Sequence, residues 1–151
     1  MSDPKGRFSK ILVAVDGSEI SMDAADYGIE LAKKDNALLI VLTVSHISLS
    51  SSIGFPHPDE LKLAKEKHEI EAKQWFNRIY KNAKQNKVQL KTELIEREMS
   101  IEAEIVEYAE REAIDLIIIG TKGRSGFRKL LLGSVAAGVV NYATCPVMVV
   151  K

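Results

Sequence analysis

The most informative pattern in this sequence is a set of spaced small residues near its C-terminal end, namely Gly120, Gly123, Gly133 and Ser134. Two residues separate the first two glycines, and nine separate the second from the third. An apolar run precedes the set and a small-residue stretch follows it, which indicates a strand, a glycine-rich loop and a helix. Glycine lets backbone N–H groups approach a ligand closely, and a helix start adds unpaired N–H groups and a positive dipole end. The pattern therefore predicts an anion site, most often for phosphate, and so a bound nucleotide.

A carboxylate stands at the end of another apolar run, where Val15 is followed by Asp16, Gly17 and Ser18. In open parallel sheets, ligands bind beyond the carboxyl ends of the strands, where the strand order reverses. If the strands that end at Asp16 and Gly120 are neighbours, both residues face one crevice. Asp16 then either accepts hydrogen bonds from ribose hydroxyls or caps the first helix or its turn, and spacing alone leaves both interpretations open.

Cations and a hydroxyl accompany the glycine-rich loop. The loop carries four basic residues, which are Lys122, Arg124, Arg128 and Lys129. They form either a collar for phosphates or a solvated basic loop, and the backbone N–H groups are the stronger candidates for phosphate contact. Ser134 could cap the following helix, bind phosphate through its hydroxyl, or do both.

Several other chemistries are excluded by spacing. The sequence contains neither G-x-x-x-x-G-K-[ST] nor G-x-G-x-x-G. The stretch 16–18 is similar to part of the aspartyl phosphatase motif, but Ala14 occupies the nucleophile position. The histidines, His46, His57 and His68, lack metal-ligand spacing and are predicted to lie on the surface or in loops.

The elements that must position these residues follow from apolar periodicity. Five segments are predicted to be strands: 10–15, 37–44, 89–96, 114–119 and 146–150. Helical spacing marks four helices between them, with Trp75 and Phe76 on an inner stripe and Ser100 as an N-cap. Strand and helix alternate, which predicts a parallel sheet with helices on both faces. The expected fold class is therefore α/β, a single-domain open five-stranded doubly wound sheet, in which 89–96 is a half-exposed edge strand.

Composition narrows the function classes. The 151 residues suit one domain, and the formal net charge of zero argues against a nucleic-acid partner. Cys145 is the sole cysteine, so no intrachain disulfide forms, and it is predicted to be buried and inert. No apolar run approaches the roughly 20 residues of a membrane-spanning helix, and the N-terminus lacks the core of a signal peptide. These features predict a cytoplasmic protein without membrane insertion. The serine-rich segment 45–58 is either a flap near the ligand edge or a disordered loop.

These residues together resemble the universal stress proteins in their ATP-binding branch. That family's motif, G-x2-G-x9-G-[ST], is matched by Gly120, Gly123, Gly133 and Ser134. The turn at Asp16 and the final stretch 146–150 are similar to the family's aspartate turn and last strand. Ala14 departs from the proline that many members carry. The resemblance covers almost the whole chain.

The resemblance implies a Rossmann-like domain over residues 1–151, with strand order 3-2-1-4-5, that binds ATP, with Mg²⁺ or Mn²⁺ bridging the phosphates. Asp16 would contact the ribose or adenine side and Val44 would pack near the adenine. The phosphates would be held by Gly120, Gly123, Gly133 and Ser134, with Arg124 and Ser125 nearby and the Val135 backbone close to the phosphates or ribose.

The same resemblance, together with the apolar last strand at a sheet edge, predicts a homodimer through that strand. The leading interpretation is a nucleotide-dependent sensor in a stress response that acts through a regulatory protein partner. The alternative is an enzyme, at most a slow ATPase or a nucleotidyl transferase. A third interpretation, a member that has lost nucleotide binding, is disfavoured by the intact glycine spacing. No catalytic residue and no metal ligand of the protein itself is predicted.

Overall fold

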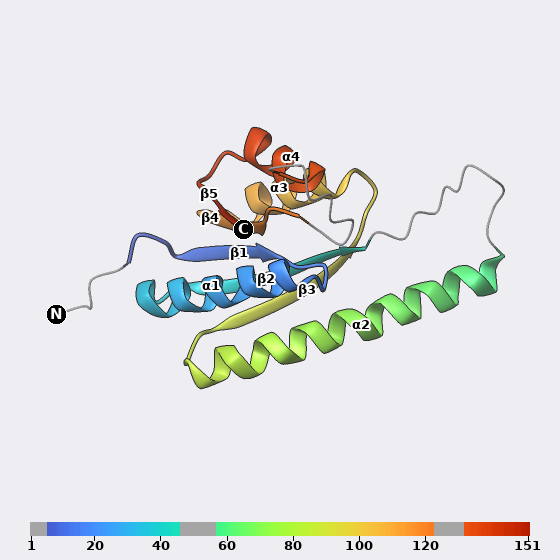
Figure 1. Ribbon diagram of the computed structural model, residues 1–151, viewed down its shortest axis with the longest axis horizontal. Helices are drawn as coiled ribbons and strands as arrows, with labels where there is room; N and C mark the ends of the chain where they lie inside the picture. Colours follow the sequence, from blue (N-terminus) through green and yellow to red (C-terminus); the bar gives the residue numbers. More distant parts are fainter. Residues whose placement is uncertain (1–5, 46–56, 123–131) are drawn as a thin grey trace.

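The computed structural model describes residues 6–45, 57–122 and 132–151, and these residues form an α/β domain (Figure 1). The elements alternate along the chain as the sequence predicts. They are β1 (Lys10–Ala14), α1 (Glu19–Asp35), β2 (Leu38–Ser45), α2 (Pro58–Gln85), β3 (Leu90–Glu96), α3 (Ile101–Arg111), β4 (Leu116–Gly120), α4 (Ser134–Tyr142) and β5 (Val147–Val150).

All five strands join one parallel sheet in the order β3-β2-β1-β4-β5. This arrangement confirms the expected topology and makes β1 and β4 neighbours, with Ile11 of β1 in register with Leu116 of β4. Strand ends differ from the predicted ones by at most two residues. The largest difference is at the start of β4, where Asp115 lies outside the strand and its carboxylate accepts hydrogen bonds from the amides of Ser9 and Lys10. The sheet order therefore brings together the strand ends that carry Asp16 and Gly120.

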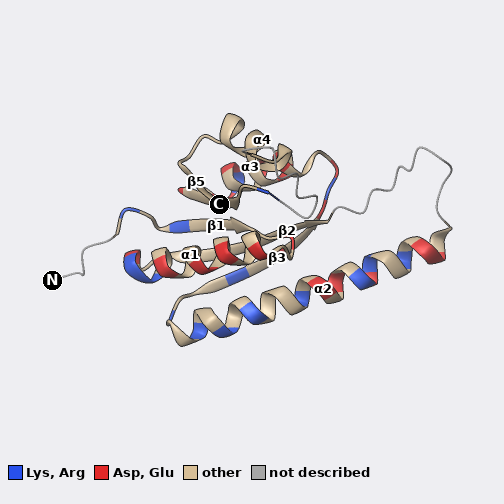
Figure 2. Cartoon of the chain, in the orientation of Figure 1, with Lys and Arg blue, Asp and Glu red and all other residues tan. Residues whose placement is uncertain are grey.

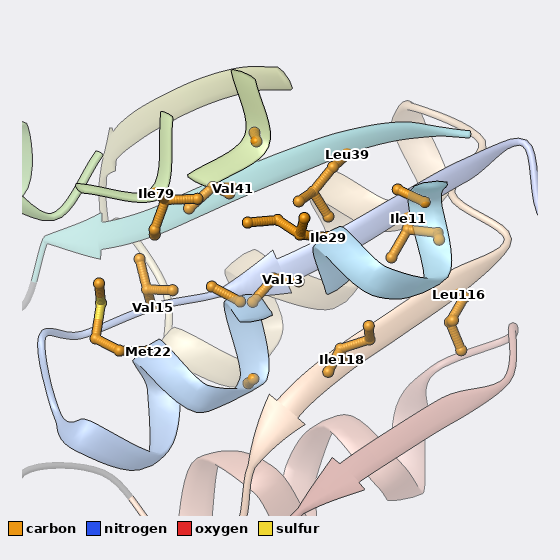
Figure 3. Close-up of a cluster of buried hydrophobic side chains, with 14 of the residues drawn as sticks. Ile11, Val13, Val15, Met22, Ile29, Leu39, Val41, Ile79, Leu116 and Ile118 are labelled. Atoms are coloured by element: carbon orange, nitrogen blue, oxygen red, sulfur yellow. The ribbon is translucent and has the colours of Figure 1, made fainter. Parts of the chain in front are cut away.

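Apolar residues cover both faces of the sheet, because successive side chains of a strand point to opposite faces. One face packs against α1 and α2 and includes Ile11, Val13, Leu39, Val41 and Ile118 (Figure 3). The other face packs against α3 and α4 through Leu12, Ile40, Leu42 and Ile117. The continuous apolar runs of β1, β2 and β4 are therefore explained by burial on both sides.

Local capping explains where the helices begin. Ser18 caps α1, where its Oγ accepts a hydrogen bond from the amide of Ser21 at 3.2 Å. Ser100 caps α3 as predicted, with its Oγ accepting from the amide of Ala103 at 3.3 Å. Acidic residues occupy the first turn and basic residues the last turn of α1, α2 and α3, which suits the helix dipole (Figure 2).

The long helix α2 has two unlike halves. Its first buried residue is His68, so the turns that precede it carry only exposed and half-buried side chains, and they extend beyond the sheet (Figure 1). The prediction that His68 is a surface or loop histidine is wrong, since its side chain is buried and lies edge-on to Trp75. His57 is exposed as predicted, and His46 lies outside the described residues. Trp75 and Phe76 pack against the core, as the helix stripe predicts.

Two further features complete the description. Cys145 is half-buried rather than buried, and burial raises the pKa of its thiol, which disfavours the thiolate form. Among the described residues, none of the helices is both long and apolar enough to cross a lipid bilayer.

Candidate functional site

A cavity of about 290 Å³ opens at the carboxyl edge of the sheet, where β1 and β4 lie side by side. Its size approaches the lower end of the range for small-molecule sites, about 300–1,000 Å³. Six elements, β1, α1, β2, α3, β4 and α4, and the segments after β1 and β4 contribute to its wall. The wall consists of Ala14, Val15, Asp16, Ser21, Leu42, Val44, Ile101, Ile105, Ile119, Gly120, Thr121, Lys122, Gly133, Ser134, Val135 and Ala136. The single crevice expected from adjacent strand ends is therefore present.

Six of the predicted site residues lie on this wall: Asp16, Val44, Gly120, Gly133, Ser134 and Val135. The other three, Gly123, Arg124 and Ser125, lie outside the described residues, as do the two remaining loop cations, Arg128 and Lys129. The segment 46–56, which forms most of the predicted flap or loop, is likewise outside them.

The turn after β1 is held by a local network around Asp16. Its Oδ1 accepts a hydrogen bond from the amide of Ser18 at 3.0 Å. The hydroxyl of Ser21 accepts from the amide of Asp16 at 3.3 Å and donates to the carbonyl of Ser18 at 2.9 Å. Asp16 thus stabilises its own turn and also borders the cavity, so the two interpretations left open by the sequence are compatible.

The entry to α4 is built on a close backbone approach. The amide of Gly133 donates a 2.6 Å hydrogen bond to the carbonyl of Thr121, which ties the start of α4 to the end of β4. A Cβ on Gly133 would lie 3.2 Å from that oxygen. Gly133 has φ −66° and ψ 166°, a conformation open to any residue, so the crowding rather than the backbone angle favours glycine here.

The helix α4 begins without a side-chain cap. Its N-cap is Gly133, which has no side chain to offer, and Ser134 is the first helical residue. The suggestion that Ser134 caps this helix is therefore wrong. Residues 133–136 all border the cavity, so the positive end of the α4 dipole adjoins it. This is the arrangement that favours an anion.

A second part of the wall consists of apolar side chains. Leu42 and Val44 come from β2, Ile119 from β4, and Ile101 and Ile105 from the start of α3. Ile101 and Ile105 lie four residues apart on one face of α3 and were not among the predicted site residues. Both residues lie in the first turns of a helix that follows a strand's carboxyl end. That position is the signal that could have assigned them to the site. The cavity wall thus combines apolar side chains with the N-terminus of a helix.

Charge on the described wall is sparse. Asp16 is its only acidic residue and Lys122 its only basic one. Gly120 borders the cavity too, but a Cβ there would also clash with the side chain of Ile20 in α1, so packing is a second reason for this glycine. Within 6–45, 57–122 and 132–151, no three His, Cys, Asp or Glu residues gather in a way that could hold a metal ion.

Comparison with known proteins gives a consistent result. The model of the universal stress protein family matches residues 7–151. Universal stress protein MJ0531 of Methanocaldococcus jannaschii is 37% identical over 145 residues, which cover 95% of this chain and 82% of the relative. Universal stress protein YxiE of Bacillus subtilis is 33% identical over 149 residues, which cover 95% of this chain and 99% of the relative.

Solved structures show the same fold. The protein MJ0577 has a TM-score of 0.82 at 28% identity, over 95% of this chain and 96% of that one. Universal stress proteins from Archaeoglobus fulgidus in complex with dAMP and from Arabidopsis thaliana with AMP bound have TM-scores of 0.70 and 0.66. The Archaeoglobus fulgidus protein is 21% identical, and the match covers 95% of this chain and 98% of that one. The Arabidopsis thaliana protein is 19% identical, and the match covers 95% of this chain and 91% of that one.

Proposed function

Because this chain belongs to the universal stress protein family, we propose that it is an ATP-binding regulatory protein of a stress response. One observation carries the proposal: Asp16, Gly133 and the N-terminus of α4 border a single cavity of about 290 Å³ whose wall also contains apolar side chains. An adenine nucleotide has the matching halves, an apolar base and an anionic tail. Neighbours of the same fold were solved with AMP and dAMP, which supports this ligand class.

In this proposal each part of the wall has a role. Val44, with Leu42, packs against the adenine, and Asp16 accepts hydrogen bonds from the ribose. Gly120, Gly133 and Ser134 hold the phosphates through backbone N–H groups and a hydroxyl, together with Gly123, Arg124 and Ser125. The backbone of Val135, in the first turn of α4, lies close to the phosphates or ribose.

A divalent ion would be bound chiefly by the nucleotide. The described wall offers one carboxylate, that of Asp16, so Mg²⁺ or Mn²⁺ would be coordinated by phosphate oxygens and water, as Mg²⁺ usually is. The ion would neutralise phosphate charge beside the helix N-terminus.

We further propose that ATP acts as a signal here. Fast phosphoryl transfer needs an oriented nucleophile in addition to positioning and charge neutralisation. Asp16 is the only acid on the described wall, and its proposed place is at the ribose. Occupancy of the site would then be passed to a regulatory protein partner. Slow ATP hydrolysis or nucleotidyl transfer is the competing activity.

The assembly and location proposed for the protein follow the same reasoning. We propose one domain over residues 1–151 that forms a homodimer through β5, an edge strand beside the exposed Val140 and Tyr142 of α4. A cytoplasmic location suits the single cysteine. The zero net charge is consistent with a partner other than nucleic acid.

The test combines ligand identification with turnover. Mass spectrometry of small molecules released from freshly purified protein should detect an adenine nucleotide. Calorimetry should show ATP binding, and phosphate release with ATP and Mg²⁺ should stay far below the ~1–100 s⁻¹ typical of kinases. Steady turnover near one per second, abolished by one substitution on the cavity wall, would favour the enzyme instead.

A further inference from the structure

The turn that carries Asp16 is contacted from outside by a residue of α2. Gly17, the next residue, has φ +85°, a left-handed conformation that favours glycine. The indole of Trp75 lies against its α-carbon: a Cβ there would clash with Cζ2 and Cε2 of the ring and lie 2.8 Å from Nε1. Glycine is therefore needed at position 17 both for its backbone angle and for this contact.

The half-buried indole has two further contacts. Trp75 packs against the cluster of buried residues that includes Val15 and Met22. The ring of His68, two helical turns earlier on α2, meets it edge-on with the centroids 6.2 Å apart and the planes at 78°. His68 is 5% exposed, so this second ring lies inside the protein. The indole is thus packed between the core, His68 and the turn.

Trp75 does not border the cavity, whereas Asp16 does. The indole contacts the turn at Gly17, between Asp16 and the residue that caps α1, Ser18. Any shift of the indole therefore changes the space available to the turn, and with it the position of the Asp16 carboxylate. Trp75 is placed to act on a ligand in this cavity through the turn.

We propose that Trp75 is a positioning residue that fixes the Asp16 turn in its ligand-binding conformation and links occupancy of the cavity to α2. The inference rests on the proposed function, since it assumes that the cavity binds ATP through Asp16. Linkage is reciprocal: if Trp75 packing strengthens ATP binding, bound ATP strengthens Trp75 packing to the same extent. Bound ATP would then change the packing of α2, and with it the surface that α2 presents to a partner. This helix packs on one face of the sheet and contributes no residue to the described cavity wall.

The first test compares ATP affinity among three variants. Trp75→Ala removes the indole behind the turn, Trp75→Phe keeps an aromatic ring, and Phe76→Ala is the matched control from the same helix and core cluster. Calorimetry should show ATP affinity about 10-fold weaker for Trp75→Ala and largely restored for Trp75→Phe. Phe76→Ala should lose stability to urea to a similar degree, yet keep ATP affinity within about 2-fold, because it does not back the Asp16 turn.

The second test uses the parent protein alone. Trp75 is the only tryptophan, so its fluorescence reports on this contact without labelling. Saturation with ATP should shift its emission and slow amide hydrogen exchange in the half of α2 around Trp75. In the Asp16→Ala variant, ATP concentrations that still saturate the variant should produce no emission shift.

The outcomes separate the two claims. Equal ATP affinity in Trp75→Ala and Phe76→Ala, or calorimetric binding to the parent without any change at Trp75, would overturn the positioning role and leave the ATP proposal standing. Absence of ATP binding to the folded parent would reject the proposed function, and the role of Trp75 with it.

Discussion

The carboxylate of Asp16 accepts a 3.0 Å hydrogen bond from the amide of Ser18, so the acid that borders the cavity also closes its own turn. Substitutions at this position therefore test two roles, and they must be chosen to separate them. Asparagine retains an acceptor oxygen for the Ser18 amide and loses the charge, whereas alanine loses both.

We expect Asp16→Ala to weaken both ATP binding and folding, and Asp16→Asn to weaken ATP binding while folding is largely kept. Loss of a hydrogen bond to a charged acceptor costs roughly 1.5–3 kcal/mol, which is about a 10- to 150-fold loss of affinity. Calorimetry and urea unfolding measure the two effects. A dissociation constant that is unchanged in Asp16→Ala would mean that the residue serves the turn alone.

Gly133→Val should abolish most ATP binding with the fold retained. The branched side chain would stand beside the carbonyl of Thr121 at the start of α4, where the proposed phosphates meet backbone N–H groups. The backbone angles of Gly133 suit any residue, but the added Cβ would crowd the Thr121 oxygen, so some loss of stability is expected while the fold is kept. Titration of both proteins with ATP, with circular dichroism as the check on folding, tests this.

Gly133→Ala provides a graded control. Its single methyl group should weaken binding by less than valine does, because it adds one carbon at the same place. Equal affinity in the parent and both variants would place the phosphates elsewhere.

Much of the fold could be predicted from the sequence, because apolar runs of strand length between amphipathic helices leave few arrangements open. The strand order could not be derived from periodicity, since each run is apolar whichever strand it pairs with, and only the family resemblance implied it. His68 was misplaced for a related reason: a polar side chain on the charged N-terminal half of α2 gives no sign that Trp75 covers it.

The site was predictable to the extent that it lies in local motifs. Asp16 and Gly133 each end a recognisable pattern. Ser21, Ile101 and Ile105 were not found, because they reach the cavity from helices whose angle to the sheet no local pattern encodes. Ser134 was considered as a cap because serine is favoured there, but the close contact with Thr121 puts glycine at the N-cap instead.

Tyr108 provides a prediction about stability and pH. Burial, and then the neighbouring Glu93 carboxylate, raise its pKa above the ordinary value of 10.0. A tyrosine whose pKa is raised on folding stabilises the protein below its unfolded pKa, and that stability is lost as the pH rises through and above about 10. Tyr108→Phe should therefore make the free energy of unfolding less sensitive to alkaline pH than it is in the parent.

At neutral pH the same substitution should be close to neutral or stabilising. Within the described residues the hydroxyl oxygen of Tyr108 is buried near the Glu93 carboxylate without a hydrogen bond of good geometry, and removal of such a group avoids its desolvation cost. Urea unfolding at pH 7 and pH 10.5 measures both effects. A loss above about 1 kcal/mol at pH 7 would show that the hydroxyl makes a net favourable hydrogen bond.

The proposed dimer can be tested at one residue of β5. The carbonyls of Pro146 and Val150 accept hydrogen bonds from the amides of Ile117 in β4 and of Thr121 just after it. The polar groups of Val149, next to Val150, therefore point to the open edge of the sheet. Val149→Pro removes one outward N–H and should convert the dimer to a monomer that remains folded. Light scattering on the parent and the variant decides the matter, and a monomeric parent would refute the proposal.

The hydrogen bond between Gly133 and Thr121 has a consequence for how this scaffold can be altered. Eleven residues lie between these two positions, and the hydrogen bond joins the two ends of that stretch. The entropy of closing a loop changes slowly with its length, so we expect substitutions between these two ends to cost little loop-closure entropy. Grafting this stretch from another relative should transfer ligand preference while the unfolding free energy stays nearly constant, which makes the binding specificity and the architecture of this protein separately evolvable.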